Sequence, residues 1–320
     1  MSELRYDPEW YELARSVLES AQMRECLPLH DVEGRRKKIE ARVRANPFTL
    51  PEDIEQTIRY ARSQDGHEVP IYHYRKKEPT GSRSFPGPAV VHIHGGGYNT
   101  VSAADVMPDL VPYVTAGAEI LSIDYRLAPE NPFPTPLEDC WAALAWIRSS
   151  AAELGIDPKR IALFGESAGG GLAAALAMVA RDRGFSPPLS KQILIYPMID
   201  DRTETDHTGG RDVFNMVDRV TSWAAYLGEL HRSGRVPPYA AAARISDEHV
   251  QGLPRMYIDV AQLDNLLYEV LEYVQKFVKA GVPVEFHLYE GVPHAFHIFA
   301  PTSKIARRAF ENRLNAILDI

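Results

Sequence analysis

Cysteine and basic charge are both scarce in this sequence. The two cysteines, Cys26 and Cys140, lie 114 positions apart, and neither belongs to a CxxC pair. This spacing predicts neither a zinc site nor a disulfide framework. Lysine and arginine number 35 against 43 aspartates and glutamates, which gives a formal net charge of −8. This balance argues against a nucleic-acid partner and makes an acidic membrane surface a poor match.

Long apolar runs are absent as well. The most apolar segment, residues 169–180, is far shorter than the roughly 20 residues needed to cross a bilayer. The opening residues, MSELRYDPEW, contain no apolar core of the kind found in secretory signals. We therefore expect a cytoplasmic protein with no membrane partner. The chain has 320 residues, 45% of them hydrophobic, which suffices for one large α/β domain or two smaller domains.

From about residue 54 onward, strand-like and helix-like patterns alternate. Two strands at 58–62 and 69–75 come first, joined by a turn at 64–66. Further strands are expected at 89–93, 120–124, 161–164, 192–196, 256–260 and 284–289, and helices at 107–116, 137–150, 172–183, 266–280 and 302–318. This alternation predicts an α/β protein with a mostly parallel sheet and helices on both faces.

Residues 1–50 do not fit the alternation. Asp7 and Pro8 suit the start of a helix. Its apolar positions form one stripe, which a lone amphipathic helix must bury. The stripe consists of Trp10, Leu13, Ala14, Val17, Leu18 and Ala21. A second helix over 34–44 is very basic but interspersed with acidic residues, so we expect a solvated face.

Residues 200–245 are the second segment outside the alternation. They are irregular and rich in proline, threonine and aspartate, with one helix expected around 220–230. Both this segment and residues 1–50 could lie over one end of the sheet.

The clearest chemical motif is Gly165-Glu166-Ser167-Ala168-Gly169, which has the form G-x-S-x-G. A predicted strand precedes it and an alanine-rich predicted helix follows, which is the context of a nucleophile elbow. The turn is so tight that its flanking positions must be glycine. Charge that develops beside the serine would also meet the dipole and free N–H groups of the helix start. Ser167 is therefore the expected nucleophile.

Three consecutive glycines follow the strand predicted at 89–93, in the run His94-Gly95-Gly96-Gly97-Tyr98. Such a run leaves backbone N–H groups uncovered, and two such donors can bind the oxygen of a tetrahedral intermediate. The alternatives are a flexible turn and a phosphate-binding loop. Because no G-K-[ST] follows, a P-loop is not expected.

A serine nucleophile needs a base and an acid that orients the base. Asp264 follows the strand predicted at 256–260, and His294 follows the strand predicted at 284–289. The chain order Ser167, Asp264, His294 is that of α/β-hydrolases. All three residues follow the carboxyl ends of strands, where open α/β sheets place their sites.

Two histidines and four carboxylates compete with these assignments. They are His92, His297, Asp259, Glu269, Asp200 and Asp201. We expect structural roles for both histidines, because a catalytic base needs loop freedom to reach the serine. Asp259 lies inside a strand and Glu269 one turn into a helix, so both rank below Asp264 as the acid. The two remaining aspartates could bind a cation, but no ligand spacing supports a metal site.

The motifs together resemble the hormone-sensitive-lipase-like branch of the α/β-hydrolases, the HGGG-type esterases. The resemblance covers about residues 55–318. It rests on residues 94–97 (HGGG), 124–130 (DYRLAPE), 132–134 (PFP), 165–170 (GESAGG) and 291–296 (GVPHAF). The sequence departs from the family at Gln262, where the family usually has an acidic residue.

The resemblance implies an eight-stranded α/β-hydrolase sheet with a helical cap, and ester hydrolysis that needs no metal or cofactor. It also implies an oxyanion hole formed by Gly96, Gly97 and Ala168, and a homodimer. Residues 1–50 are then expected to supply N-terminal cap helices. Residues 51–320 would form the catalytic domain, with a cap insertion at about 200–245.

The sequence thus predicts a serine esterase that cleaves short- to medium-chain acyl or small aromatic esters through an acyl-enzyme intermediate. Tyr98, Phe214, Trp223 and Tyr226 are the candidate substrate-binding residues, with packing in the core or cap as the alternative. A lactonase would share the same triad. The presence of His294 argues against a non-catalytic ligand receptor on this fold. A peptidase is also disfavoured, because an amide nitrogen is a much poorer leaving group and nothing in the sequence marks a pocket for a peptide side chain.

Overall fold

A single eight-stranded sheet organises the computed structural model, which describes residues 4–20, 26–77 and 86–320. The strand order is β1-β2-β4-β3-β5-β6-β7-β8. β2 runs antiparallel to both β1 and β4, and every other neighbouring pair is parallel. The strands are β1 (Ile54–Arg62), β2 (Glu68–Lys76), β3 (Gly87–Ile93), β4 (Ile120–Ile123), β5 (Ile156–Glu166), β6 (Lys191–Ile195), β7 (Met256–Leu263) and β8 (Val284–Pro293). The predicted fold class is confirmed.

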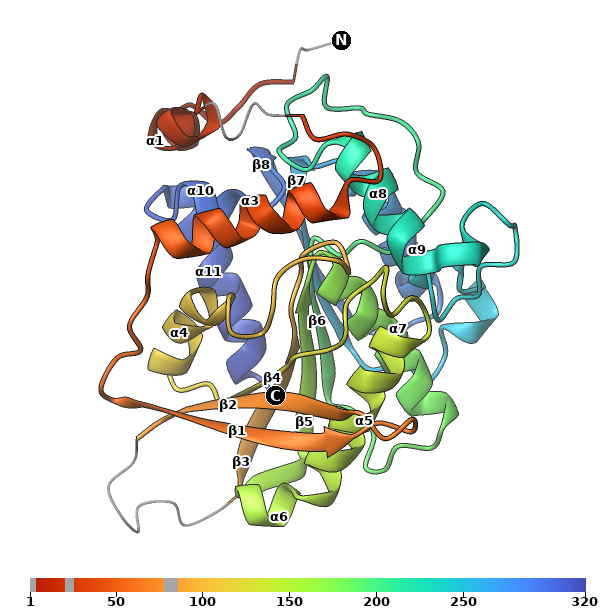
Figure 1. Ribbon diagram of the computed structural model, residues 1–320. Coiled ribbons are helices and arrows are strands. Elements are labelled where there is room, and N and C mark those ends of the chain that lie inside the picture. Colours follow the sequence, from red (N-terminus) through yellow and green to blue (C-terminus); the bar gives the residue numbers. More distant parts are fainter. Residues whose placement is uncertain (1–3, 21–25, 78–85) are drawn as a thin grey trace.

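Helices cover both faces of the sheet. Figure 1 shows α4 (Met107–Thr115) and α11 (Lys304–Leu318) on one face, and α5 (Thr135–Ser149) and α7 (Ala168–Asp182) on the other. β4 and β6 are buried along their whole length, as parallel strands covered on both sides should be. α9 (Leu267–Lys279) packs against β7 and β8. The short elements are α6 (Ala151–Leu154), α10 (Phe296–Phe299), η1 (Gly228–Leu230), η2 (Ala242–Arg244) and η3 (Asp247–His249).

α1 (Pro8–Leu18) begins where the sequence predicts a helix start. The Asp7 carboxylate accepts a hydrogen bond from the Trp10 amide at 2.7 Å. Trp10 and Ala14 are buried against residues of β8, α10 and α11. The Trp10 indole N–H donates to the carbonyl of Phe296, on α10, at 2.9 Å. α1 thus packs against the part of the chain that carries His294.

The apolar stripe predicted for this helix is only partly buried. Leu13 and Val17 are 47% and 43% exposed, so the expected burial is wrong for these two residues. The physical reason is that α1 contacts the rest of the protein along a narrow line through Trp10 and Ala14. Ala21, the last member of the predicted stripe, lies outside the described residues.

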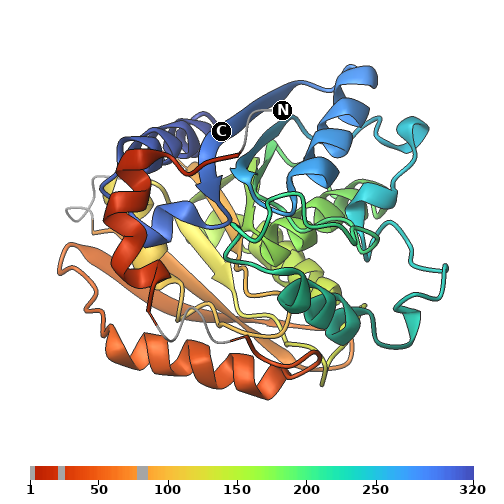
Figure 2. The ribbon, with the colours of Figure 1, turned by 90° about the horizontal axis from the view of Figure 1, so that it is seen from above.

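The second N-terminal helix, α3 (Val32–Ala45), lies beside α8 (Met216–Leu227) across one end of the sheet (Figures 1 and 2). Arg35 Nε donates to the Asp218 carboxylate of α8 at 2.9 Å. Arg36 Nε donates to the Asn99 carbonyl, in the loop after β3, at 2.8 Å. The predicted solvated face is therefore wrong for Arg35, which is 8% exposed, because α8 covers it. No helix within the described ranges has the length and apolar character of a membrane span.

Candidate active site

Ser167 stands alone between the end of β5 and the start of α7, with φ 54° and ψ −120°. Its neighbours leave no room for side chains. A Cβ on Gly165 would lie 2.3 Å from the Gly169 carbonyl oxygen, and a Cβ on Gly169 would lie 2.0 Å from the Ile93 carbonyl oxygen. The glycines of the G-x-S-x-G motif are thus required by backbone packing. A positive φ is strained for a residue other than glycine, and it is typical of the sharp turn that presents the serine hydroxyl.

Hydrogen bonds join the three residues that the sequence nominates. Ser167 Oγ lies 3.0 Å from His294 Nε2, and His294 Nδ1 lies 2.7 Å from Asp264 Oδ2. The other oxygen of Asp264 accepts the Leu266 amide at 2.9 Å, which holds the carboxylate in place. Because Asp264 can only accept, Nδ1 carries the proton and Nε2 is free to accept from the serine hydroxyl. This arrangement can remove a proton from Ser167.

The surroundings of His294 favour its protonated form. Burial lowers the pKa of His294, but the charge and hydrogen bond of Asp264 and the charge of Asp212 outweigh it, so the net shift is upward. The Tyr196 ring meets the imidazole edge-on at 4.5 Å, and the Phe214 ring lies tilted at 5.3 Å. An imidazolium at this position would therefore be stabilised by the nearby carboxylates, and the two aromatic rings would limit its reorientation.

The two rival histidines are placed as the sequence analysis expects. His92 Nδ1 lies 2.8 Å from Ser122 Oγ, and its Nε2 lies 2.8 Å from a carboxylate oxygen of Glu166. Burial lowers the pKa of His297 far below its ordinary value, so its ring is neutral. Within the described ranges neither ring hydrogen-bonds to Ser167, so His294 is the histidine positioned to act on it.

The four rival carboxylates are each held by an arginine. Asp259 pairs with Arg313, Glu269 with Arg219, Asp200 with Arg202 and Asp201 with Arg244. These ion pairs occupy the carboxylates that could have replaced Asp264 or bound a cation. Among residues 4–20, 26–77 and 86–320, no cluster of three or more histidines, cysteines or carboxylates could hold a metal ion.

The glycine run after β3 is a tight loop beside the serine. Gly96 and Gly97 have φ values of 100° and 61°, which favour glycine. The Gly96 carbonyl accepts from the amides of Asn99 and Thr100 at 3.2 and 2.9 Å, which turns the loop back on itself. A Cβ on Gly95 would lie 3.4 Å from the Cβ of Ser167. The loop therefore lies against the elbow.

The amides expected to form the oxyanion hole are those of Gly96, Gly97 and Ala168. In the part of the chain that the structure describes, none of these three N–H groups takes part in a backbone or side-chain hydrogen bond. Ala168 is also the first residue of α7, where the helix dipole favours negative charge. Free donors thus come from the loop after β3 and from the residue that directly follows Ser167.

Three of the four predicted substrate-binding residues are packing residues. Tyr98, Trp223 and Tyr226 are only 1–2% exposed. The Tyr98 and Tyr226 rings stack at 4.0 Å, and the Tyr98 hydroxyl donates to the Met198 carbonyl at 2.9 Å. Their surfaces are therefore taken up by one another and by the chain. Phe214 differs, since it is partly exposed and lies against His294.

Sequence reasoning missed Asp212, which accepts the His294 amide at 3.1 Å. No motif marks this residue, because it lies in the irregular segment where neither periodicity nor a strand end points to a role. The sequence also did not predict a contact for Gln262, whose side-chain oxygen accepts the Gly291 amide at 3.0 Å. The departure from the acidic residue of the family thus places a neutral acceptor beside the end of β8, three residues before the histidine.

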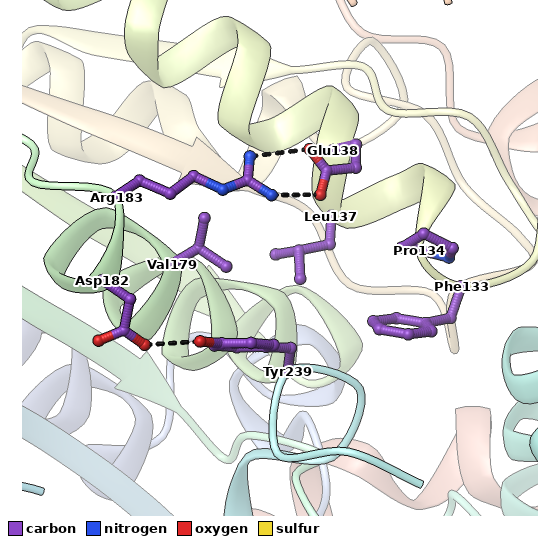
Figure 3. Close-up of a pocket in the computed structure, with 8 residues that line it drawn as sticks. All are labelled: Phe133, Pro134, Leu137, Glu138, Val179, Asp182, Arg183 and Tyr239. Carbon is purple, nitrogen blue, oxygen red and sulfur yellow. Dashed lines mark hydrogen bonds and ion pairs between the residues drawn. The ribbon is translucent and has the colours of Figure 1, made fainter. Parts of the chain in front are cut away.

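A separate small pocket lies at the other end of α7. It encloses about 90 Å³ and is lined by Phe133, Pro134, Leu137, Glu138, Val179, Asp182, Arg183 and Tyr239. Figure 3 shows its two polar contacts, Glu138 with Arg183 and Asp182 with Tyr239. Because α7 begins beside Ser167 and ends at Asp182, the pocket is roughly 20 Å from the serine. It is also smaller than sites for organic ligands usually are, so it is not the active site.

Comparison with known proteins agrees with the fold. A family model described as the alpha/beta hydrolase fold matches residues 90–298. The chain is 36% identical over 238 residues to carboxylesterase NlhH of Mycobacterium tuberculosis, covering 72% of this chain and 73% of that protein. It is 34% identical over 267 residues to esterase LipI of the same organism, covering 79% of each. The solved structure of a bacterial heroin esterase superposes with a TM-score of 0.87, at 34% identity and with 98% of each chain covered.

The fold and these relatives define the class. The chain belongs to the α/β-hydrolase fold family. Within that family it belongs to the hormone-sensitive-lipase-like esterases, and it is a carboxylesterase-type hydrolase.

Proposed function

We propose that this chain is a serine esterase in which Ser167 attacks the carbonyl carbon of a carboxylic ester. The observation that supports this most strongly is the hydrogen-bonded series from Ser167 through His294 to Asp264, with distances of 3.0 and 2.7 Å. A hydroxyl, an imidazole and a buried carboxylate in this order form the arrangement that general-base catalysis by serine requires.

In the first half-reaction, His294 Nε2 takes the proton from the Ser167 hydroxyl as its oxygen bonds to the ester carbon. The carbonyl oxygen becomes an oxyanion, which the N–H groups of Gly96, Gly97 and Ala168 stabilise. Removal of one such donor costs about 10²–10³ in rate in serine hydrolases. When the intermediate collapses, the bond to the alcohol oxygen breaks and His294 gives its proton to the leaving alcohol.

The second half-reaction reverses these roles. A water molecule gives a proton to His294 Nε2 while its oxygen attacks the acyl-enzyme carbon. The bond to Ser167 then breaks, the serine oxygen regains the proton, and the carboxylic acid leaves. Throughout, Asp264 keeps the proton on Nδ1 and stabilises the imidazolium.

For the substrate we propose short- to medium-chain acyl or small aromatic esters. Phe214, partly exposed and 5.3 Å from the His294 ring, offers an apolar surface next to the reacting atoms. We further propose that α3 and α8 form the cap of a catalytic domain spanning residues 51–320. The ion pair of Arg35 with Asp218 supports this. A cytoplasmic location and a homodimer are further expectations.

A lactonase is the alternative that shares every catalytic group. The test is hydrolysis of p-nitrophenyl acetate, butyrate and decanoate beside a simple aliphatic lactone. An esterase hydrolyses the butyrate ester at least tenfold more efficiently, by kcat/KM, than the lactone. The reverse order would assign lactonase activity, and no turnover of any substrate would contradict a hydrolase.

A further inference from the structure

A carboxylate from the segment between β6 and α8 lies beside the Asp264–His294 pair. Asp212 Oδ1 accepts the backbone amide of His294 at 3.1 Å and that of Phe214 at 3.3 Å. Its second oxygen accepts the amide of Asn265 at 2.8 Å. One side chain thus binds three backbone N–H groups that are far apart in the sequence.

Each of these amides belongs to a functional part of the site. His294 is the proposed base, Asn265 directly follows the proposed acid Asp264, and Phe214 packs its ring on the imidazole. The loops after β7 and β8 come from different parts of the chain, so non-covalent contacts must fix their relative position. Asp212 joins them through two hydrogen bonds, and it joins both to the segment that leads into α8.

The charge of Asp212 matters as well as its position. Burial raises the pKa of Asp212 to about 7, and the negative charge of Asp264 adds to that rise. The carboxylate form of Asp212 in turn contributes to the raised pKa of His294, and the positive charge of a protonated His294 lowers the pKa of Asp212. Three backbone donors favour the ionised form of a carboxyl group, which offsets part of the cost of burying it.

We propose that Asp212 is a positioning residue for ester hydrolysis. It fixes the His294 loop relative to the Asp264 loop and supplies a second negative charge that stabilises the imidazolium. This inference rests on the proposed function, since it assumes that His294 is the base. Asp212 contacts backbone amides and not the serine, so it acts through His294 and Asp264.

Other titratable groups around His294 are Asp264 after β7, Arg219 on α8, His297 on α10 and Tyr196 after β6. Asp264 has a negative charge of its own, which acts together with that of Asp212 and does not replace it. Arg219 is positive and lowers the pKa of His294. His297 is neutral, and burial raises the pKa of Tyr196 well above its ordinary value, so that its hydroxyl is also neutral. Removal of the Asp212 charge therefore lowers the pKa of His294.

The test is Asp212→Asn, which keeps the size of the side chain. The asparagine oxygen can still accept the amides of His294 and Phe214, but its NH₂ group faces the Asn265 amide donor and the charge is gone. We expect kcat on p-nitrophenyl butyrate to fall about tenfold or more, with KM changed less than about twofold. The acid limb of kcat/KM should move to lower pH by roughly 0.5–1 unit.

Asp206→Asn is the matched control. Asp206 lies in the same segment, and its carboxylate likewise accepts backbone amides, those of Thr208 at 2.8 Å and Gly210 at 3.0 Å. We expect this variant to keep the wild-type acid limb. Asp212→Glu retains the charge but moves the carboxylate, so it should lose kcat while its acid limb stays near the wild-type position.

A folded Asp212→Asn protein with wild-type kcat and acid limb would overturn the proposal, as would an equal shift in Asp206→Asn. If Asp212→Asn does not fold, as judged by circular dichroism, Asp212→Ser supplies a second uncharged variant for the same profile. Failure of the proposed function is distinguishable: the wild type would then lack esterase activity, or activity would not depend on Ser167. If the wild type has esterase activity that depends on Ser167, an unchanged pH profile in Asp212→Asn contradicts only the role proposed for Asp212.

Discussion

The amide of Asp7 donates a 2.7 Å hydrogen bond to the carbonyl of Gly291, three residues before His294. A Cβ on Gly291 would lie 2.6 Å from the Asp7 nitrogen, so the N-terminal segment directly touches the backbone near the end of β8. The Trp10 indole bonds to Phe296 on the other side of the histidine. The start of the chain therefore supports the proposed base from both sides.

Deletion of residues 1–45 should consequently damage both solubility and catalysis. It removes the bonds to Gly291 and Phe296, uncovers the apolar surface under Trp10, and takes α3 away from α8. We expect more aggregation, and a larger loss of kcat/KM on p-nitrophenyl decanoate than on the acetate, because the proposed cap would supply apolar surface for long acyl chains. Light scattering and the ratio of the two rates measure these effects.

Deletion of residues 1–3 is the control for this experiment, because it keeps the hydrogen bonds of Asp7 and Trp10 and the ion pair of Arg35 described above. This shorter protein should behave as wild type. If the longer deletion stayed soluble with an unchanged decanoate-to-acetate ratio, these helices would be a structural brace alone and the cap proposal would fail.

The pH dependence of activity should follow His294. The neutral imidazole is the active form, so the rate falls as the pH drops through the pKa of the folded state. Asp264 raises that pKa despite burial, which places the midpoint of the acid limb above the ordinary histidine value of about 6.5. A profile of kcat/KM from pH 5 to 9 measures it. A midpoint below 6 would show that the carboxylate does not stabilise the imidazolium.

Phe214→Ala should change substrate selectivity, whereas Trp223→Ala should change the stability of the fold. Phe214 is partly exposed beside His294, so its loss should lower kcat/KM for decanoate about fivefold or more relative to acetate and change stability little. Trp223 is buried, so its loss should destabilise the fold by about 3–5 kcal/mol without such a change in the rate ratio. Thermal unfolding and the two rates separate these outcomes. If only Trp223→Ala changed the decanoate-to-acetate ratio, Trp223 and not Phe214 would be the substrate-binding residue.

Local sequence patterns were enough to nominate Ser167, Asp264 and His294. Each lies at the end of a strand whose apolar run is visible in the sequence, and the glycines around Ser167 are dictated by contacts within the same turn. Asp212 could not be found in this way. Its role depends on amides 53 and 82 positions further along the chain, and no local signal encodes such a contact.

The same reason explains why the sequence did not distinguish packing from substrate contact for the aromatic residues, and why it was wrong for Arg35. Trp223 and Tyr226 have the aromatic character of a pocket wall, but whether a ring faces a ligand or another ring depends on the packing of α8 against the loop after β3. Arg35 reads as solvated because its neighbours in sequence are charged, whereas its exposure is set by α8, more than 180 positions away.

The most direct test of the account is labelling of the purified protein with a fluorophosphonate, followed by mass spectrometry of its peptides. If Ser167 is the nucleophile, one adduct forms, on Ser167, and p-nitrophenyl butyrate hydrolysis is lost in proportion to labelling. Ser167→Ala should bind no label and retain less than about one thousandth of the wild-type rate. An adduct on another residue, or a Ser167→Ala protein that kept a tenth of the activity, would contradict Ser167 as the nucleophile.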